Sequence, residues 1–436
     1  MTVQGASDRQ QEPACSGGRA RPSLIAVGAM LPGSGFTRVL QTLLGRLSRW
    51  YEVHYVGIGY RGPRRVEHQV TLHPSNLHGG DLFGAYQCAE MVQALDAPLV
   101  LLLNDLWMLR SYPRALRPLG DRVRTVAYVP IDGTVPDDAL LEPISTIDHF
   151  VAYTEFGRRE IGRALASVAA RGREVADRNV SVIPHGVDTT TFRPLAGALQ
   201  AQLLPGARLA VRRRLWPDEP DWHDAFVVLN ANRPMPRKRI DLTLDGFAAF
   251  AQGKPPSVKL WLHHAIMSPD ERATLTAQIE RLGIAGRVRL TPPGSAPLSD
   301  ADLNLTYNAC DVGVNTSMGE GWGLVSFEHA ATGAAQVVPS HSACSELWDG
   351  AAELVETQDV GVPPSSLLGM RTVTAEGVAA ALDRLDADPE RLRRRSRAAF
   401  QNALDPAYAW DRIAEQWHAR FERLLHDLPA RRTRYA

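Results

Sequence analysis

Short apolar runs alternate with longer amphipathic stretches along most of the 436 residues, and this alternation limits the possible folds more than any other feature. Leu24–Val27 leads into the turn Pro32–Gly35, and leucines then recur at three- and four-residue spacing as far as Leu47. A strand, a glycine turn and a helix in this order are typical of the opening of a Rossmann unit. Further strand-like runs follow at Glu52–Ile58, Pro98–Leu103, Arg124–Val129, His149–Ala152 and Val180–Ile183. The alternation predicts a parallel sheet with helices on both faces.

A second series of strand-like runs begins after the proline-flanked connector Pro184–Pro194. Its members are Ala225–Asn230, Val258–His263, Val288–Leu290, Val312–Asn315 and Gln336–Val338. The last thirty residues show helical spacing of Trp410, Ile413, Trp417 and Phe421. We therefore predict an α/β chain with two Rossmann-like, doubly wound domains. The predicted divisions are a disordered segment 1–22, a first domain 23–194 joined by the terminal helix 410–436, and a second domain 195–409.

Composition excludes several classes of function. Lys and Arg number 48, as do Asp and Glu, and a neutral chain argues against nucleic acid as the main partner. Four cysteines lie far apart without CxxC spacing, which favours a reducing compartment. The longest apolar stretch, near Ala97–Leu103, is far too short to span a bilayer, and the first twenty residues lack the apolar core of a signal peptide. We expect a soluble cytoplasmic protein without a transmembrane segment.

A glycine-rich stretch follows the predicted strand that ends at Asn315. Gly319, Gly321 and Gly323 surround Glu320 and Trp322, and Glu328 lies eight residues after Glu320 in the helix that follows. Glycines at such a junction let backbone N–H groups approach a ligand, and ionised carboxylates accept hydrogen bonds from sugar hydroxyls. Taken alone, the loop is equally compatible with a plain glycine turn that carries a solvated glutamate.

A basic stretch follows the predicted strand that ends at Asn230. Arg233, Arg237, Lys238 and Arg239 lie within seven residues, just beyond the carboxyl end of the strand. Ligands of open α/β sheets bind at that edge, so the four cations are candidates for a diphosphate clamp. A solvated basic loop is the alternative. Only three lysines occur in the chain, so a lysine inside an arginine cluster is unusual here.

Together the two stretches resemble family 4 of the retaining glycosyltransferases, which adopt the two-domain GT-B fold. The family's E-x7-E signature matches Glu320 and Glu328, and its Arg-x4-Lys pair matches Arg233 and Lys238. Ile183–Phe192 (IPHGVDTTTF) is similar to the interdomain segment of the family, with a histidine in place of the commoner asparagine. Pro32–Phe36 fits the amino-terminal glycine loop, and Trp410–Leu425 fits the closing helix that crosses back to the first domain.

The resemblance implies a role for each matching residue. Arg233 and Lys238 would bind the donor diphosphate, Glu320 the transferred sugar, and Glu328 the ribose hydroxyls. The other residues implied at the donor cleft are Gly33, Gly35, Pro293, Gly294, Gly321, Trp322, Gly323 and Leu324. In this set Pro293 and Gly294 would flank the base, and the backbone amides of 321–324 would bind the sugar and phosphates.

One departure from the family concerns a histidine that many members place at the end of an amino-terminal strand. The corresponding segment here, Arg124–Gly133, offers Asp132 instead, and Asp105 after the run Ala97–Leu103 is a second candidate. Either aspartate is also a plausible helix or turn cap. Asp300-Ala301-Asp302 and Asp386-Ala387-Asp388 have DxD spacing, which binds metal in another glycosyltransferase fold, but both are expected to open helices. We therefore predict neither a metal nor another cofactor.

The predicted activity is retaining transfer of a hexose from a UDP- or GDP-linked sugar to a hydroxyl acceptor, which the sequence leaves open between a small metabolite, a glycan and a lipid-linked sugar. The same architecture also occurs in nucleotide-sugar epimerases and glycogen-type phosphorylases. A non-catalytic sugar-nucleotide-binding protein remains a third alternative, because fold does not determine activity.

Overall fold

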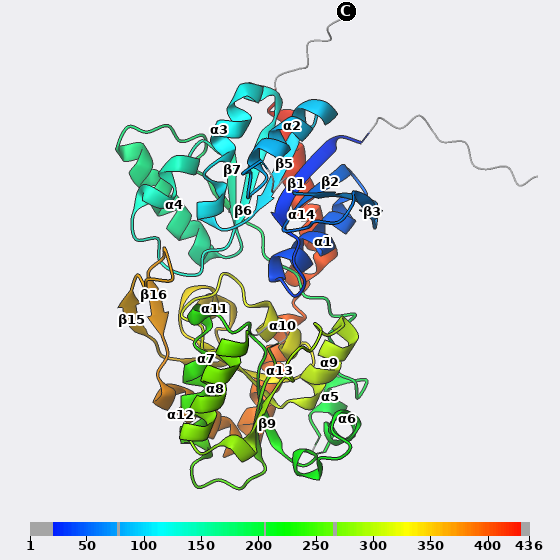
Figure 1. Ribbon diagram of the computed structural model, residues 1–436, viewed down its shortest axis with the longest axis vertical. Helices are drawn as coiled ribbons and strands as arrows, with labels where there is room; N and C mark the ends of the chain where they lie inside the picture. Colours follow the sequence, from blue (N-terminus) through cyan, green and yellow to red (C-terminus); the bar gives the residue numbers. More distant parts are fainter. Residues whose placement is uncertain (1–20, 76–78, 205, 265–267, 429–436) are drawn as a thin grey trace, which may run out of the picture.

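The computed structural model describes residues 21–428 except 76–78, 205 and 265–267. Two α/β lobes lie one above the other (Figure 1). The predicted stretch 1–22 falls almost entirely outside the described residues, as do 429–436 of the predicted terminal helix. No described helix is long and apolar enough to cross a membrane.

The first domain contains an eight-stranded sheet in the order β3-β4-β2-β1-β5-β6-β7-β8, parallel except for the β3–β4 pair. Its strands are β1 Ser23–Ala29, β2 Glu52–Ile58, β3 Arg65–Glu67, β4 Val70–Pro74, β5 Leu99–Leu103, β6 Arg124–Val129, β7 His149–Ala152 and β8 Val180–Val182. Its helices are α1 Gly35–Leu47, α2 Ala85–Leu95, α3 Tyr112–Leu116 and α4 Glu155–Ala170. Every residue of β5 is buried, since helices cover both faces of the sheet.

The second domain contains a six-stranded parallel sheet in the order β11-β10-β9-β12-β13-β14. Its strands are β9 Phe226–Asn230, β10 Val258–Leu262, β11 Val288–Leu290, β12 Val312–Val314, β13 Ala335–Pro339 and β14 Glu353–Val355. Its helices are α5 Leu199–Gln202, α6 Leu209–Leu215, α7 Ile240–Ala251, α8 Pro269–Arg281, α9 Asp300–Ala309, α10 Leu324–Ala330, α11 Ser342–Leu347, α12 Ala375–Asp386 and α13 Pro389–Ala403. A hairpin, β15 Gln358–Gly361 and β16 Met370–Thr372, stands apart from this sheet.

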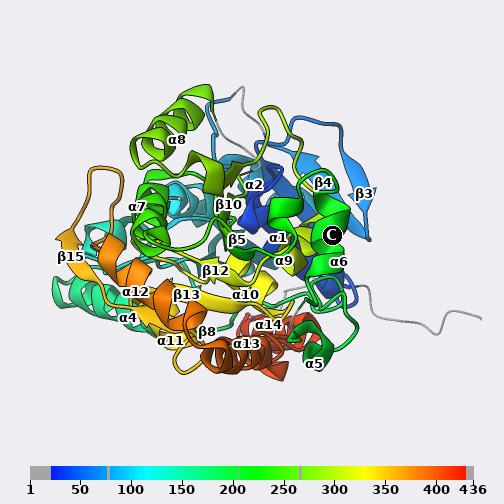
Figure 2. The ribbon, with the colours of Figure 1, turned by 90° about the horizontal axis from the view of Figure 1, so that it is seen from below.

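Helices cover both faces of the second sheet (Figure 2). Leu244 and Phe247 of α7 share one apolar core with Leu382 of α12, whereas Phe327 of α10 and Ala399 of α13 belong to the core on the other face. The prediction of two doubly wound domains is therefore confirmed. The pattern missed the short strands β3 and β14, the hairpin, and β4, which lies between β3 and β2. The exact domain boundary at 194/195 stays a prediction.

The last helix, α14 Trp410–His426, returns to the first domain and packs against α1, which confirms the predicted crossing (Figure 1). The ring of His418 stacks on Trp50 with centroids 4.4 Å apart, and Trp417 meets Tyr128 of β6 edge-on at 4.9 Å. The outgoing and returning chain segments touch, because the Val187 amide donates to the Tyr408 carbonyl at 2.9 Å. Both crossings between domains thus lie together.

The two domains are in direct contact away from these crossings. Thr134 after β6 and Gly369 before β16 form an antiparallel bridge with N···O distances of 2.9 and 2.7 Å. The Glu346 carboxylate of α11 accepts the backbone N–H groups of Glu155 and Phe156 in the first turn of α4, each at 2.8 Å. A carboxylate is favourable at a helix N-terminus, where N–H groups lack partners within the helix. The structure is therefore a closed arrangement of the two lobes.

We expect Trp417→Ala to lower the free energy of unfolding by about 3–5 kcal/mol, because it removes a fully buried indole from the contact between α14 and the first sheet. Urea unfolding followed by far-UV circular dichroism measures this loss. His426→Ala, at the largely exposed end of the same helix, is the matched control and should leave the midpoint unchanged. A Trp417→Ala protein as stable as the wild type would contradict the described packing of α14.

Candidate active site

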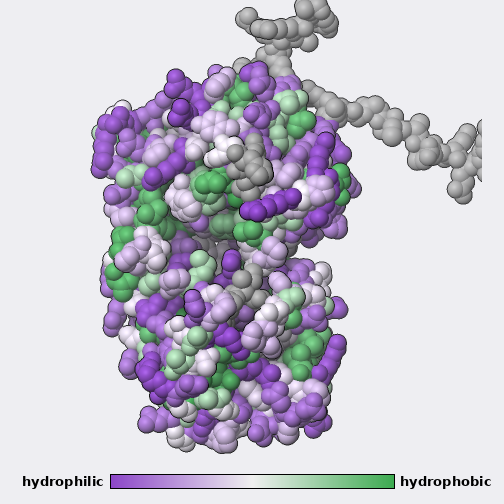
Figure 3. Space-filling view, viewed as in Figure 1, coloured by the Kyte–Doolittle hydropathy of each residue, from purple (hydrophilic) through white to green (hydrophobic). Residues whose placement is uncertain are grey.

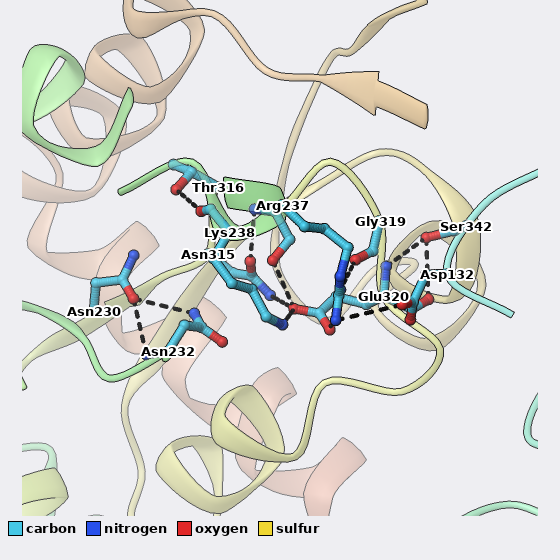
Figure 4. A network of polar contacts seen from close by, with 11 residues as sticks. Asp132, Asn230, Asn232, Arg237, Lys238, Asn315, Thr316, Gly319, Glu320 and Ser342 are labelled. Carbon is cyan, nitrogen blue, oxygen red and sulfur yellow. Dashed lines mark hydrogen bonds and ion pairs between the residues drawn. The ribbon is translucent and has the colours of Figure 1, made fainter. Parts of the chain in front are cut away.

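Polar side chains from both domains meet where three parallel strands end. Lys238 and Arg237 lie in the loop after β9, Glu320 lies in the glycine loop after β12, and Asp132 follows β6 of the first domain (Figure 4). The carboxyl edge of an open α/β sheet is the usual place for a ligand. The structure thus brings three of the four residues predicted as catalytic, Lys238, Glu320 and Asp132, into one volume.

Thr316 fixes the two loops of the second domain relative to each other. Its hydroxyl lies 3.0 and 2.8 Å from the carbonyl oxygens of Lys238 and Arg239, and 2.8 Å from the hydroxyl of Thr243 in α7. Asn230, at the end of β9, donates to the same Thr243 at 2.8 Å. These buried contacts link the basic loop to the glycine loop, so the charged side chains start from a fixed backbone.

Glu320 is a buried carboxylate surrounded by donors. Its Oε1 atom lies 2.5 Å from Lys238 Nζ, 3.0 Å from Asn315 Nδ2 and 2.8 Å from Ser317 Oγ. Burial alone would raise its pKa, but the charges of Lys238 and Arg237 outweigh that effect and hold the pKa at about 2. Burial conversely lowers the pKa of Lys238, despite the stabilising charge of Glu320. Glu320 is therefore ionised, and its amine partner is held at a fixed position.

Arg237 connects the two domains. Its guanidinium lies 3.5 Å from Glu320 Oε2 and 3.4 Å from Asp132 Oδ2, and it also donates to the Gly319 carbonyl. Burial opposes its charge, but the carboxylates of Asp132 and Glu320 together raise its pKa. The inner cation beside Lys238 is thus Arg237, and sequence reasoning did not select it from the four cations of this loop.

Asp105, the reserve candidate, lies close to this group. Burial raises the pKa of its carboxyl group to about 6, and the neighbouring charge of Asp132 acts in the same direction. Arg237 and a hydrogen bond from Trp107 oppose the rise. The two aspartates proposed as alternatives therefore lie together and interact electrostatically.

The glycine loop is shaped by the first domain. A Cβ atom on Gly319 would lie 1.9 Å from the carbonyl oxygen of Asp132, and one on Gly321 would lie 3.0 Å from Pro130. Gly323 has φ 95°, which favours glycine, and α10 starts immediately after it. A Cβ on Gly35 would come within 3.2 Å of Leu324, so the two predicted glycine loops also approach each other. Gly33 has φ 68° in the turn before α1.

Glu328 is buried in α10 and already forms an ion pair with an arginine. Arg38 Nη1 of α1 lies 3.3 Å from its Oε1, and the hydroxyl of Tyr307 donates to its Oε2 at 3.0 Å. Burial raises its pKa even though Arg38 opposes the rise. Arg38 also pairs with Asp300 at 2.7 Å, and these groups border a small cavity of about 30 Å³. The carboxylate predicted to hold the ribose is thus bound to the first domain in this structure.

The remaining predicted residues lie further from the charged group. Arg233 is exposed and makes no side-chain hydrogen bond or ion pair with the described residues. Pro293 and Gly294 are exposed in the loop after β11. The Trp322 ring stacks on Phe327 at 4.8 Å and faces His185 at 5.6 Å, so its side chain belongs to the apolar core. Only the backbone amide of Trp322 remains for the predicted contact with the sugar and phosphates.

The described residues contain no cluster of three or more His, Cys, Asp or Glu that could hold a metal ion. Asp300 and Asp302 lie in the first turn of α9, as expected, and Asp388 caps α13 by accepting from Glu390 and Arg391. Asp386 differs from the expectation, because it ends α12 and pairs with Lys254 at 2.6 Å. The absence of a cofactor stays a prediction.

Known proteins resemble the chain in sequence and in fold. D-inositol 3-phosphate glycosyltransferase of Geodermatophilus obscurus is 32% identical over 185 residues, which are 40% of this chain and 37% of that relative. Sucrose-phosphate synthase from Thermosynechococcus elongatus has a TM-score of 0.68 at 17% identity, over 93% of this chain and 100% of that one. Anabaena Alr3699/HepE, solved in complex with UDP and glucose, has a TM-score of 0.64 at 16% identity, over 92% and 100%. No family model matches the chain.

Two doubly wound domains whose strand ends face each other are the GT-B fold, which the solved glycosyltransferase structures share. The chain has this fold, and the named relatives include glycosyltransferases, in line with the resemblance to family 4 that the motifs indicated. The alignment covers less than two fifths of the length of the Geodermatophilus relative.

We expect Glu320→Gln to weaken the acid dependence of stability. The folded pKa of Glu320 is about 2 and its ordinary value is 4.5, so the folded state binds fewer protons between these pH values. Its contribution is complete above pH 4.5 and is lost as the pH falls toward 2. Urea midpoints between pH 7 and pH 3 measure this dependence, which should be flatter in the variant.

Glu353→Gln is the matched control. Burial of Glu353 is outweighed by Arg391, Arg395 and Arg384, which likewise hold its pKa at about 2, but this group is separate from the charged site. Both variants should therefore show a flatter dependence of the urea midpoint on pH, and the Glu353 variant gives the size of the change expected from one such carboxylate. An unchanged pH profile of the Glu320 variant would contradict the described ion pairs.

Proposed function

We propose that the protein is a retaining glycosyltransferase that moves a hexose from a nucleoside-diphosphate sugar to a hydroxyl acceptor. The observation that carries the proposal is the group formed by Lys238, Arg237 and Glu320 at the edge of the second sheet, which Asp132 closes from the first domain. Cations held at fixed positions in a cleft are suited to charge that grows on a departing diphosphate. UDP- and GDP-linked sugars are both compatible with this group.

Each group would then have a defined task. Lys238 and Arg237 would stabilise the leaving diphosphate, with exposed Arg233 as a further phosphate contact from the same loop. Glu320 would hold Lys238 in place and accept a hydrogen bond from a hydroxyl group of the transferred sugar. Glu328 would give up its ion pair with Arg38 and accept hydrogen bonds from the ribose hydroxyls. Domain closure would exclude water and so limit hydrolysis of the donor.

Retention would follow from attack on the face that the diphosphate leaves. The departing phosphate oxygen would take the proton of the acceptor hydroxyl, the bond from the anomeric carbon to that oxygen would break, and a new bond to the acceptor oxygen would form on the same face. Asp132 and Asp105 would bind sugar hydroxyls rather than act as nucleophiles, because Arg237 engages the first and the raised pKa of the second leaves it partly neutral. No metal is required in this scheme, since the two cations supply the positive charge.

Two alternative activities share the same architecture, an epimerase and a phosphorylase. An epimerase would change the donor sugar without an acceptor, which mass spectrometry and NMR of donor-only reactions would detect. A phosphorylase would need a lysine for pyridoxal phosphate, but Lys238 contacts Glu320, Lys254 pairs with Asp383 and Asp386, and Lys259 donates to the Gly286 carbonyl.

We expect nucleotide sugars to stabilise the protein against heat and Lys238→Ala to remove most of this effect. A donor at a hundred times its dissociation constant adds about 2.7 kcal/mol to the free energy of unfolding. Loss of one fixed cation costs roughly 3–4 kcal/mol in the barrier, so turnover should fall about a hundred- to a thousandfold. Thermal melts across UDP- and GDP-sugars, followed by product mass spectrometry, give both measurements.

Lys254→Ala is the control, because Lys254 forms surface ion pairs with Asp383 and Asp386. The donor should raise the melting temperature of Lys254→Ala by as much as it raises that of the wild-type protein. A melt of each variant without donor checks that it folds. Near-normal turnover of folded Lys238→Ala would exclude the assigned role, and a wild-type protein that no nucleotide sugar stabilises would exclude the proposed function.

A further inference from the structure

An exposed aromatic side chain lies directly beside the polar groups of the site. Trp107 follows Asp105 at the end of β5 and is 45% exposed. It lies two residues after Asp105, whose carboxyl group interacts with Asp132 and Arg237. An edge-on contact with Phe83 holds the ring, while much of its surface remains open to solvent.

Other apolar side chains extend this surface. Phe83 meets Trp107 edge-on with ring centroids 5.3 Å apart, and it lies in the loop that leads from β4 into α2. Leu82 in the same loop is 58% exposed, and Tyr86 in the first turn of α2 is 47% exposed. We name Trp107, Phe83, Leu82 and Tyr86 the aromatic platform. Hydrophobic surface borders the crevice between the lobes on the upper lobe (Figure 3).

The position of the aromatic platform connects it to the site. The loops that carry it leave the carboxyl ends of β4 and β5, the edge of the first sheet that also carries Asp132 after β6. A ligand that places a hydroxyl near Asp132 therefore has its remaining part within reach of Trp107. Exposed apolar groups gathered around a few polar ones are typical of binding sites for organic molecules.

We propose that the acceptor is an uncharged hydroxyl compound with a flat apolar group, such as an aromatic aglycone, and that this group stacks on Trp107. The inference rests on the proposed function and names its acceptor class. The carboxyl groups of Asp105 and Asp132 lie next to the platform, and they favour hydroxyl groups over a phosphate at this place. The Trp107 ring, held edge-on by Phe83, offers an exposed flat apolar face for such a group.

Matched phenyl and methyl glycosides of glucose, galactose and mannose test the proposal. Their dissociation constants are measured by isothermal titration calorimetry on the full chain saturated with UDP or GDP. We expect the phenyl compound of at least one pair to bind about tenfold more tightly than its methyl partner, the order of magnitude of one aromatic contact. Trp107→Ala should abolish this difference, and Trp107→Phe should keep most of it. Val66→Ala on β3, which also truncates an exposed apolar side chain, should leave the difference intact.

The outcomes separate the acceptor class from the proposed function. Equal affinities for the phenyl and methyl compounds of every pair would contradict the proposed acceptor class. An equal loss of affinity for both compounds in Trp107→Ala would contradict it as well. Binding of glucose 6-phosphate more tightly than phenyl glucoside would also overturn it. Stabilisation of the wild-type protein by nucleotide sugars reports the donor site independently, so a protein with a normal donor response but no phenyl preference retains the proposed function and loses the platform.

Discussion

The buried ion pair of Lys238 and Glu320 is the interaction on which the arrangement of the site depends. Two charges taken out of water are costly, and their mutual attraction offsets the cost only with close geometry and further hydrogen bonds. Asn315 and Ser317 supply those bonds to the carboxylate, and Thr316 between them fixes the backbone of the basic loop. The charged groups are therefore positioned before any ligand arrives, which is the condition for electrostatic stabilisation of a transition state.

The first domain engages these groups in the closed arrangement. Asp132 contacts Arg237, and Arg38 contacts Glu328, so the first domain occupies the positions that the proposed function assigns to the diphosphate and to the ribose hydroxyls. A donor would have to exchange these contacts for its own. In the proposed function, domain closure and donor binding would thus be coupled through the same side chains, so that the free energy of one process would depend on the other.

The sequence predicts the fold well because its strongest signals are local. Buried parallel strands such as β5 and β9 are apolar except for Asn230 at the end of β9, and the glycine turns that follow β1 and β12 mark the junctions with helices. Edge strands β3 and β14 and the hairpin β15–β16 lack that signal, since three or four residues show no period. The terminal helix was recognisable because its aromatic residues recur on one face.

The site was predictable where the charged residues lie close together in the sequence. Lys238, Glu320 and Glu328 follow from short motifs, whereas Arg38 and Glu328 are 290 positions apart and no local pattern links them. Arg237 could have been found, since it lies beside Lys238, but the motif spacing favoured Arg233 at the exposed start of the loop. The contact of Trp107 with Asp105 involves neighbours in sequence, yet only the structure shows that the ring remains open to solvent.

Part of the seam between the lobes is built from backbone. Thr134 bridges Gly369, a Cβ on Gly133 would lie 2.2 Å from the Gly369 carbonyl oxygen, and Gly319 meets the carbonyl of Asp132 without any space for a side chain. Even a single methyl group at such a position would act as a wedge. Alanine at 133 or 319 would therefore hold the lobes apart at this seam.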